Sequence, residues 1–484
     1  MARAVAIGAV GLLVACSGGG PASPTHPYDP LAYARARAGV VDNPEAAVPP
    51  QCYTATAGVA NPCWACHTVG KAPNHLVDWE LQQEYAFSDA ALTNHWTNLF
   101  VDRGPHVAET DLAEVEAWIR TDNYPPLRAA LAGREDFAGW VPDLAFAAGV
   151  DAAGFARDGS GWRAIRYQPF PGAFWPTNGA TDDVFVRLPA RLRPDRDTEV
   201  ANYGILEAAV TGRGSLPATW VGVEEPVVPG VYPLGVEFLH SVRYVDLSAP
   251  GALSARMKEL RYSKKVQALD RWGYVDAYRI EAEDKSEGGL PVYRGEAEVG
   301  LRNDFGWQYQ GWIEDAEGRL RLQTDEEHRT CMGCHGGLGV TVDSSFAFPR
   351  KLPGEAGWQS QDLRGQVDRP QRGHATGEVA TWLARTGGGD ELRSNDEVAA
   401  RYFVDGALDR SRLPTDLADL LLPSEARAAV LNAAWMSLVR DQTYTLGRVA
   451  LPSPAVNVFK QIENGDTELG KAGRVYADGG LLLE

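Results

Sequence analysis

The sequence predicts an α+β fold, and three observations lead to this prediction. Residues 51–135 carry apolar positions at helical spacing, whereas residues 136–325 hold short β-favouring runs between glycines and prolines. Residues 326–484 end in a strongly amphipathic helical pattern. At 484 residues, 44% of them hydrophobic, the chain is long enough for a substantial core and two or three domains. We expect a small helical unit, a strand-rich middle domain with long loops and a helical C-terminal part.

The N-terminus has the pattern of an export signal. Arg3 is its only early charge, and the apolar run over 4–14 is too short to cross a bilayer as a mature helix. The run ends in Leu13-Val14-Ala15-Cys16, which resembles the lipobox of bacterial lipoproteins. This resemblance implies that residues 1–15 are a signal peptide and that Cys16 carries the lipid. The alternative is an ordinary secretory signal with an incidental cysteine.

A Gly/Pro/Ser-rich stretch over 16–50 follows, and such a composition predicts a tether between a lipid anchor and the folded body. Ser17 directly after the cysteine favours sorting to the outer membrane. We expect a lipid-anchored envelope protein whose body faces the periplasm or the cell surface.

The helical unit at 51–135 rests on three segments. Gln82–Phe87 and Asp89–Phe100 have helical spacing, and Asp111–Arg120 places apolar side chains on one stripe. The middle domain rests on strands near Val184–Leu188 and Val242–Val245.

Three further elements complete the expected fold. One helix is expected within the middle domain, over Leu253–Asp270, and Phe305–Ile313 with Leu320–Gln323 predicts a β-hairpin. A short helix is expected over Glu326–Cys334, and Ser424 is the predicted N-cap of a helix from Glu425 to about Thr445.

The motif Cys-x-x-Cys-His occurs twice, at 63–67 and at 331–335. This is the attachment pattern for haem c, because two cysteine sulfurs bond to the haem vinyl groups and the next histidine ligates the iron. Two other readings are open. The two cysteine pairs could supply the four thiolates of a zinc site, or each pair could be a redox dithiol. Neither reading explains the histidine after both pairs.

On these ten residues the chain resembles the dihaem c-type cytochromes. The resemblance implies two covalently attached haem c groups, bound by Cys63, Cys66 and His67 and by Cys331, Cys334 and His335. It implies iron ligation by His67 and His335, and a cytochrome c-like unit at 51–135.

The ligand on the second face of each iron decides between electron transfer and catalysis. Methionine is scarce, so histidine is the expected ligand. We expect His95 at the first haem and His240 at the second, with His75 and His374 as the alternatives. The sixth cysteine, Cys52, is either an inert buried thiol or a thiolate ligand to the first haem.

The predicted function is electron transfer in the bacterial cell envelope, with redox proteins, such as other cytochromes, as partners. The formal net charge of −18 argues against nucleic-acid binding and suits a basic protein partner. The alternative is an enzyme resembling dihaem peroxidases or haem c oxygenases, with one iron open to substrate. No catalytic residue is singled out by the sequence.

Overall fold

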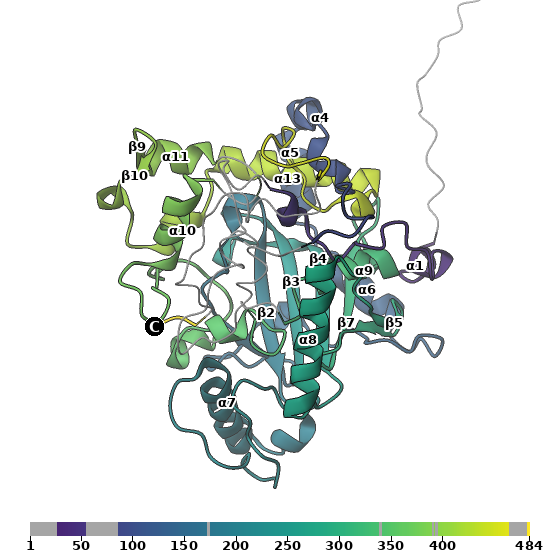
Figure 1. The fold of residues 1–484 in the computed structure, drawn as a ribbon, viewed down its shortest axis with the longest axis vertical. Coiled ribbons are helices and arrows are strands. Elements are labelled where there is room, and N and C mark those ends of the chain that lie inside the picture. The colour runs from purple at the N-terminus through teal and green to yellow at the C-terminus, as the bar shows by residue number, and fades with distance from the viewer. Residues whose placement is uncertain are drawn as a thin grey trace, which may run out of the picture.

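The computed structural model describes residues 27–54, 86–171, 175–337, 341–389, 392, 395–463 and 482–484. Its helices lie around one large sheet, and β9 and β10 form a second, two-stranded sheet (Figure 1). In chain order the helices and strands are α1 (Ala32–Ala36), α4 (Gly104–Glu109), α5 (Leu112–Ile119), α6 (Tyr124–Leu131), β1 (Arg163–Ile165), β2 (Thr181–Arg187), α7 (Arg196–Thr211), β3 (Glu237–Val245), β4 (Leu253–Lys265), α8 (Arg271–Glu287), β5 (Arg294–Glu296), β6 (Gly300–Arg302), β7 (Trp307–Glu314), β8 (Leu320–Leu322), α9 (Asp325–Met332), α10 (Glu378–Thr386), α11 (Asp396–Tyr402), β9 (Phe403–Val404), β10 (Ala407–Leu408), α12 (Leu417–Leu421) and α13 (Glu425–Asp441).

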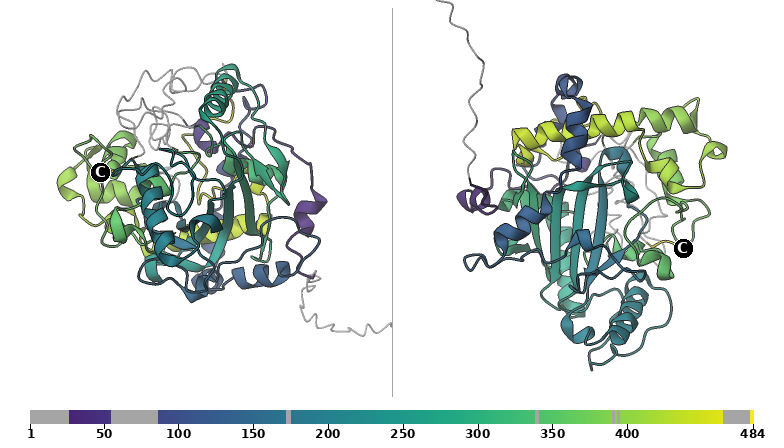
Figure 2. Two further views of the ribbon diagram at one scale, coloured as in Figure 1. Left: turned by 90° about the horizontal axis from the view of Figure 1, so that it is seen from below. Right: turned by 180° about the vertical axis from the view of Figure 1, so that it is seen from behind.

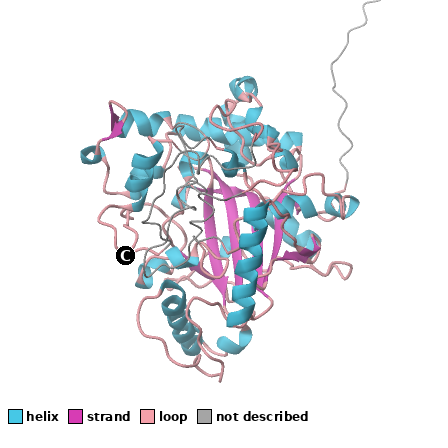
Figure 3. Ribbon diagram, viewed as in Figure 1, coloured by secondary structure: helices cyan, strands magenta, loops and turns pink. Residues whose placement is uncertain are grey.

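The sheet has eight strands in the order β1-β2-β3-β4-β7-β6-β5, and β8 also pairs with β7. Every neighbouring pair is antiparallel. The register places His240 of β3 opposite Arg261 of β4, and Arg261 opposite Gly311 of β7. Figure 3 shows the strands at the centre with helices around them, so the predicted α+β class is confirmed.

The two faces of the sheet pack against different parts of the chain, because successive side chains of a strand point to opposite sides. Val184, Val186 and Phe238 belong to a buried cluster that includes α7. Phe185 and Leu239 belong to the cluster that includes α6. Helix α8 lies in front of the sheet in Figure 1, and Figure 2 shows the molecule from behind.

Helix α13 lies near one end of the sheet (Figure 1). The side chain of Ser424 accepts from the backbone N–H of Arg427, which confirms the predicted N-cap. The indole N–H of Trp435 donates to Glu314 at 3.1 Å, and Asn432 donates to the carbonyl of Val245 at 2.8 Å. These buried bonds fix α13 to the ends of β7 and β3.

Several predicted elements are confirmed. The hairpin is formed by β7 and β8, with Trp312 opposite Leu322. Helix α5 and helix α9 lie where the spacing predicts them.

Two helix predictions are wrong. Leu253–Lys265 is the strand β4, which is paired on both sides and buried along most of its length. A strand buried on both faces loses the alternating pattern that would have distinguished it. Within Asp89–Phe100 only Thr97–Phe100 is helical, as a 3-10 turn. There the side chain of Asn94 accepts from the backbone N–H of Trp96, and such local bonds compete with a helix.

The first motif at 63–67, most of Gln82–Phe87 and the expected lipidation site Cys16 lie outside the described residues. Of the expected cytochrome c-like unit at 51–135, the structure describes 51–54 and 86–135, which include α4, α5 and α6 but not the motif itself. None of the helices within the described ranges has both the length and the apolar character needed to cross a membrane.

Candidate functional site

The second motif begins on α9, and local sequence explains why this helix starts at Asp325. The backbone N–H of Glu327 donates to the Thr324 hydroxyl at 3.2 Å, and the Glu327 carboxylate accepts from the N–H of Thr324 at 2.8 Å. This is a capping box, which satisfies two N–H groups at the helix start. Arg321 also donates twice to Glu327, both at 2.9 Å. The buried Arg321 charge holds the pKa of the Glu327 carboxyl below its usual value, against the opposing effect of burial. The start of α9 is thereby fixed.

Close backbone packing holds the motif in place. A Cβ added to Gly333 would lie 1.6 Å from the carbonyl oxygen of Ala47, so glycine is required at position 333 for this close approach. On the other side, the N–H of Gly337 donates to the carboxylate of Glu281 on α8. The motif is therefore held between the segment around Ala47 and helix α8.

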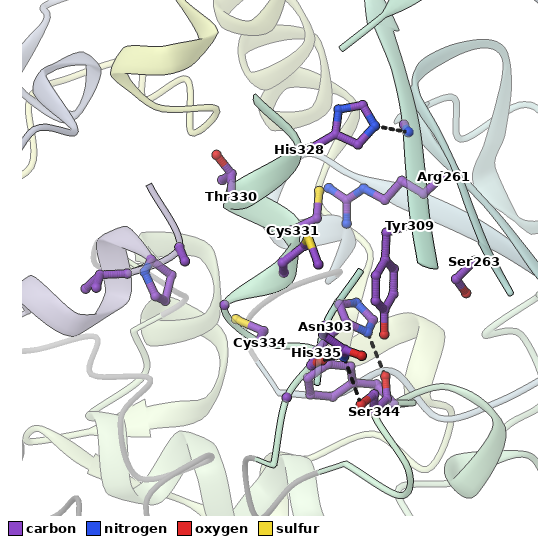
Figure 4. A pocket seen from close by; sticks show the side chains of 18 of the residues that line it. Arg261, Ser263, Asn303, Tyr309, His328, Thr330, Cys331, Cys334, His335 and Ser344 are labelled. Atoms are coloured by element: carbon purple, nitrogen blue, oxygen red, sulfur yellow. Dashed lines mark hydrogen bonds between the residues drawn. The ribbon is translucent and has the colours of Figure 1, made fainter. Parts of the chain in front are cut away.

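The two cysteines present thiols to one cavity. Cys331 and Cys334 are half-buried, and both line a cavity of about 500 Å³. Figure 4 shows them near Arg261 and His335.

His335 has a defined orientation. Its Nδ1 lies 2.8 Å from the carbonyl oxygen of Ser344, and Asn303 donates to the backbone oxygen of His335 at 2.7 Å (Figure 4). Because a carbonyl oxygen only accepts, Nδ1 must carry the proton and Nε2 keeps its lone pair. Burial lowers the pKa of His335 to about 4. The ring is therefore neutral near pH 7, in the form that binds a metal ion.

The sheet forms one wall of the cavity. Side chains that point to the same face of β2, β3, β4 and β7 line it, because alternate residues of a strand share a face. The lining includes Val184, Phe238, His240, Val242, Glu259, Arg261, Ser263, Trp307, Tyr309, His335 and Phe346. A largely apolar cavity of this size falls within the range of about 300–1,000 Å³ that is typical of small-molecule and cofactor sites.

A buried ionic group lies on this wall. Glu259 accepts from Arg261 at 2.9 Å and from Arg448 at 3.0 Å. Burial acts to raise the pKa of Glu259, but the charges of the two arginines hold it at about 2. Arg448 also lies 3.6 Å from the sulfur of Cys331, and its buried Nε has no hydrogen-bond partner among the described residues. Positive charge is thus held beside the cysteines.

His240, the expected second ligand at this site, lines the same cavity. Its Nε2 lies 3.0 Å from the carboxylate of Asp182, which is almost fully buried and also accepts from the hydroxyl of Tyr167. The structure therefore brings His240 into the site but directs Nε2 toward Asp182.

His95, expected at the first haem, does not line this cavity. Its Nε2 lies 2.9 Å from the carbonyl of Ala90. His374 is half-buried and does not line this cavity, and His75 lies outside the described residues. Cys52 lines the cavity as a half-buried thiol.

Within the described ranges, no three His, Cys, Asp or Glu side chains form a group that could hold a metal ion. A haem iron makes no such demand, because the porphyrin supplies four nitrogens and the protein adds one or two axial ligands.

A model of a lipoprotein family, whose description reads "-like lipoprotein", matches residues 36–413. The chain is also 31% identical, over 498 aligned positions, to an uncharacterized lipoprotein of Aquifex aeolicus (strain VF5), with 84% of this chain and 86% of that protein covered. The chain belongs to this lipoprotein family. No solved structure matches the lipoprotein.

The family places the lipoprotein in the cell envelope, attached to a membrane through a lipid anchor. The resemblance to dihaem c-type cytochromes is wrong as a family assignment. The family and the relative are both described as lipoproteins, and neither points to a cytochrome family. Ten motif residues are too few to define a family, because a short attachment motif occurs on unrelated folds.

Sequence reasoning missed residues that surround His335. Ser344 and Asn303 contact the histidine directly, and Asp182 holds His240. The signal that the sequence offers for such surroundings is the group of glycines at 333, 336 and 337, because glycine allows another part of the backbone to approach closely.

Proposed function

We propose that the lipoprotein attaches haem c at Cys331 and Cys334, with His335 as the iron ligand, and exchanges electrons in the cell envelope. The proposal extends to a second haem at Cys63, Cys66 and His67. The observation that carries it is the orientation of His335: Nδ1 is bonded to the Ser344 carbonyl, so Nε2 is left for the iron beside two thiols. Metal-ligating histidines usually donate their other ring N–H in this way.

The surrounding residues fit such a group. The cavity of about 500 Å³ is lined mainly by apolar and aromatic side chains, which would exclude water from a macrocycle. Arg261 and Arg448 provide positive charge for carboxylates at its edge. When bound, the haem would supply a one-electron couple, and the chain would hold it covalently and set its potential.

The net charge of the chain indicates which kind of electron partner it would bind. A formal net charge of −18 favours a basic redox protein. We propose such a protein as the electron partner, with the body of the lipoprotein facing the periplasm or the cell surface from the outer membrane.

The haem content of variants expressed with a haem c maturation system tests the proposal. We expect two covalent haems per wild-type chain, measured as haem that stays with the chain after denaturation. Cys331→Ser/Cys334→Ser and Cys63→Ser/Cys66→Ser should each retain one. Cys52→Ser is the matched control and should retain two. A Cys331→Ser/Cys334→Ser variant that still binds two haems would contradict the proposal.

One observation favours a second candidate function, an enzyme resembling peroxidases or oxygenases. The Nε2 of His240 is directed to Asp182, so this histidine is placed to exchange a proton with a substrate in the cavity instead of closing the second face of the iron. Asp182, held by Tyr167, would fix the ring.

Carbon monoxide separates the two functions. If His240 is the second ligand, carbon monoxide does not change the absorption spectrum of the reduced wild type. The reduced His240→Ala variant then binds carbon monoxide. If the iron is open, the wild type binds carbon monoxide, and His240→Ala still binds it but loses turnover of peroxide.

A further inference from the structure

The loop that follows the second motif contains a two-residue turn of an unusual kind. Val342 and Ser345 exchange two backbone hydrogen bonds of 3.0 Å. Between them, Asp343 has φ 46° and Ser344 has φ 62°. Positive φ at both central residues is typical of a type I′ turn, where glycine and asparagine are preferred. An aspartate followed by a serine holds this conformation only if the surroundings stabilise it.

Asp343 is held by four donors. Its Oδ1 accepts from Lys265 at 2.5 Å, from the hydroxyl of Tyr274 at 3.0 Å and from the indole of Trp307 at 3.3 Å. Its Oδ2 accepts from the backbone N–H of Tyr232 at 3.0 Å. The Lys265 side chain is 0% exposed and that of Asp343 1%, so this ion pair is shielded from water.

Lys265 is itself fixed in place. Besides Asp343, its ammonium donates to the carbonyl of Phe305 at 2.8 Å and to the hydroxyl of Tyr274 at 2.8 Å. It is the last residue of β4, directly opposite Trp307 of β7. The turn is therefore attached to the rigid sheet through one buried carboxylate.

The turn reaches the iron ligand through the next residue. The carbonyl of Ser344 accepts from Nδ1 of His335, and Asn303 donates both to the backbone of His335 and, at 3.3 Å, to the Ser344 hydroxyl. The direction of that carbonyl depends on the φ of Ser344, which the anchored Asp343 maintains.

We propose that the buried Lys265–Asp343 pair is a positioning device for His335, which holds the Ser344 carbonyl so that the imidazole keeps its proton on Nδ1 and presents Nε2 to the cavity. The inference rests on the proposed role of His335 as the haem ligand. Neither residue touches the proposed cofactor in this role, and both act through Ser344.

Donation from Nδ1 makes Nε2 more basic, and a more basic ligand stabilises the oxidised iron. Loss of the pair is expected to raise the reduction potential of the haem at this motif. In this role the pair helps to set the reduction potential of the haem at this motif.

Histidine NMR of the full chain tests the positioning without any haem. In a ¹⁵N-histidine-labelled wild type, we expect an exchange-protected Nδ1–H signal from His335, which is told apart from that of the buried His328 by its absence from His335→Gln. In Lys265→Met and Asp343→Asn, its exchange should be about tenfold faster, which corresponds to about 1.4 kcal/mol of lost local stability. Lys351→Met is the matched control, because the Lys351 side chain is as buried as that of Lys265 and also pairs with a carboxylate, that of Glu207.

Equal signals in the wild type, Lys265→Met and Asp343→Asn would overturn the proposal, and so would an equal loss in Lys351→Met. If Lys265→Met and Asp343→Asn fail to fold, Tyr274→Phe decides, because it removes one donor to Asp343 and keeps the ring. Faster exchange in Tyr274→Phe supports the positioning role, and unchanged exchange rules it out.

Redox titration of haem-loaded protein gives the second readout. A raised potential in Lys265→Met, with an unchanged potential in Lys351→Met, supports the device; equal potentials in the two variants overturn its effect on the haem. A chain that binds no haem at this motif but shows the NMR effect refutes the proposed function alone.

Discussion

Gly333, which stands between the two cysteines of the second motif, fits its position because it lacks a side chain. An added Cβ would lie 1.6 Å from the carbonyl of Ala47. We expect Gly333→Ala to lower the free energy of unfolding by about 1–3 kcal/mol, as overpacking does. Gly204 in α7 has open space around it, and Gly204→Ala should raise this free energy by about 0.5–1 kcal/mol. Urea unfolding measures both variants, and equal effects would contradict the packing argument.

His328 makes stability depend on pH. Burial lowers its pKa to about 4, its Nδ1 donates to the Thr324 carbonyl and its Nε2 accepts from the N–H of Gly311. The unfolded chain takes up a proton near pH 6.5, whereas the folded chain resists it to about pH 4. The contribution of His328 to the free energy of unfolding, up to about 3 kcal/mol, is therefore fully present above pH 6.5 and is lost as the pH falls through 4.

Unfolding of wild type and His328→Gln between pH 7 and pH 4 measures this contribution. We expect a shallower decline in the variant, because glutamine does not titrate. The same slope in both proteins would show that His328 contributes nothing to it.

At the scale of elements, the capping box decides whether α9 is formed up to its first residue. Thr324→Ala removes the acceptor for the N–H of Glu327 and should lower the free energy of unfolding by about 1 kcal/mol. Thr324→Ser keeps the hydroxyl and should stay close to wild type. Hydrogen exchange in α9 provides the local check: faster exchange is expected in Thr324→Ala only, and no difference from the serine variant would exclude the capping role.

Elements with local signals could be predicted from the sequence, and elements set by distant partners could not. Helix α13 has its Ser424 cap and an apolar face, and the β7–β8 hairpin has a turn between two β-favouring runs. The sequence predicts a helix at strand β4, because a strand that is paired on both sides with β3 and β7 and buried carries no alternating pattern.

The candidate site divides in the same way. The motif 331–335 can be read from five adjacent residues, whereas Lys265 and Asp343 lie 78 positions apart and carry no joint pattern. His240 could be named in advance, but its bond to Asp182 on the neighbouring strand could not.

At the scale of the whole molecule, the net charge of −18 predicts how a partner approaches. If the proposed electron transfer involves a basic protein, its bimolecular rate should fall as ionic strength rises, because the Debye length shrinks to about 10 Å at 0.1 M salt. Stopped-flow oxidation of the reduced lipoprotein by a basic redox protein measures this rate. An uncharged small oxidant is the control and should be insensitive to salt. A rate with the basic protein that is equally insensitive would count against charge-guided docking.

The segment around Gly39 and Asp42 is held in place by hydrogen bonds to residues far along the chain. The backbone N–H groups of Gly39 and Asp42 donate to carboxylates of α9, across 286 and 284 positions. A chain that emerges N-terminus first leaves these groups without their partners while that length is made, which takes about 15–60 s at ordinary rates of synthesis. During this interval the early part of an envelope lipoprotein is open to proteases and wrong contacts. A chain that stops before α9 therefore lacks the carboxylates that accept from Gly39 and Asp42, and its N-terminal segment cannot take its final place.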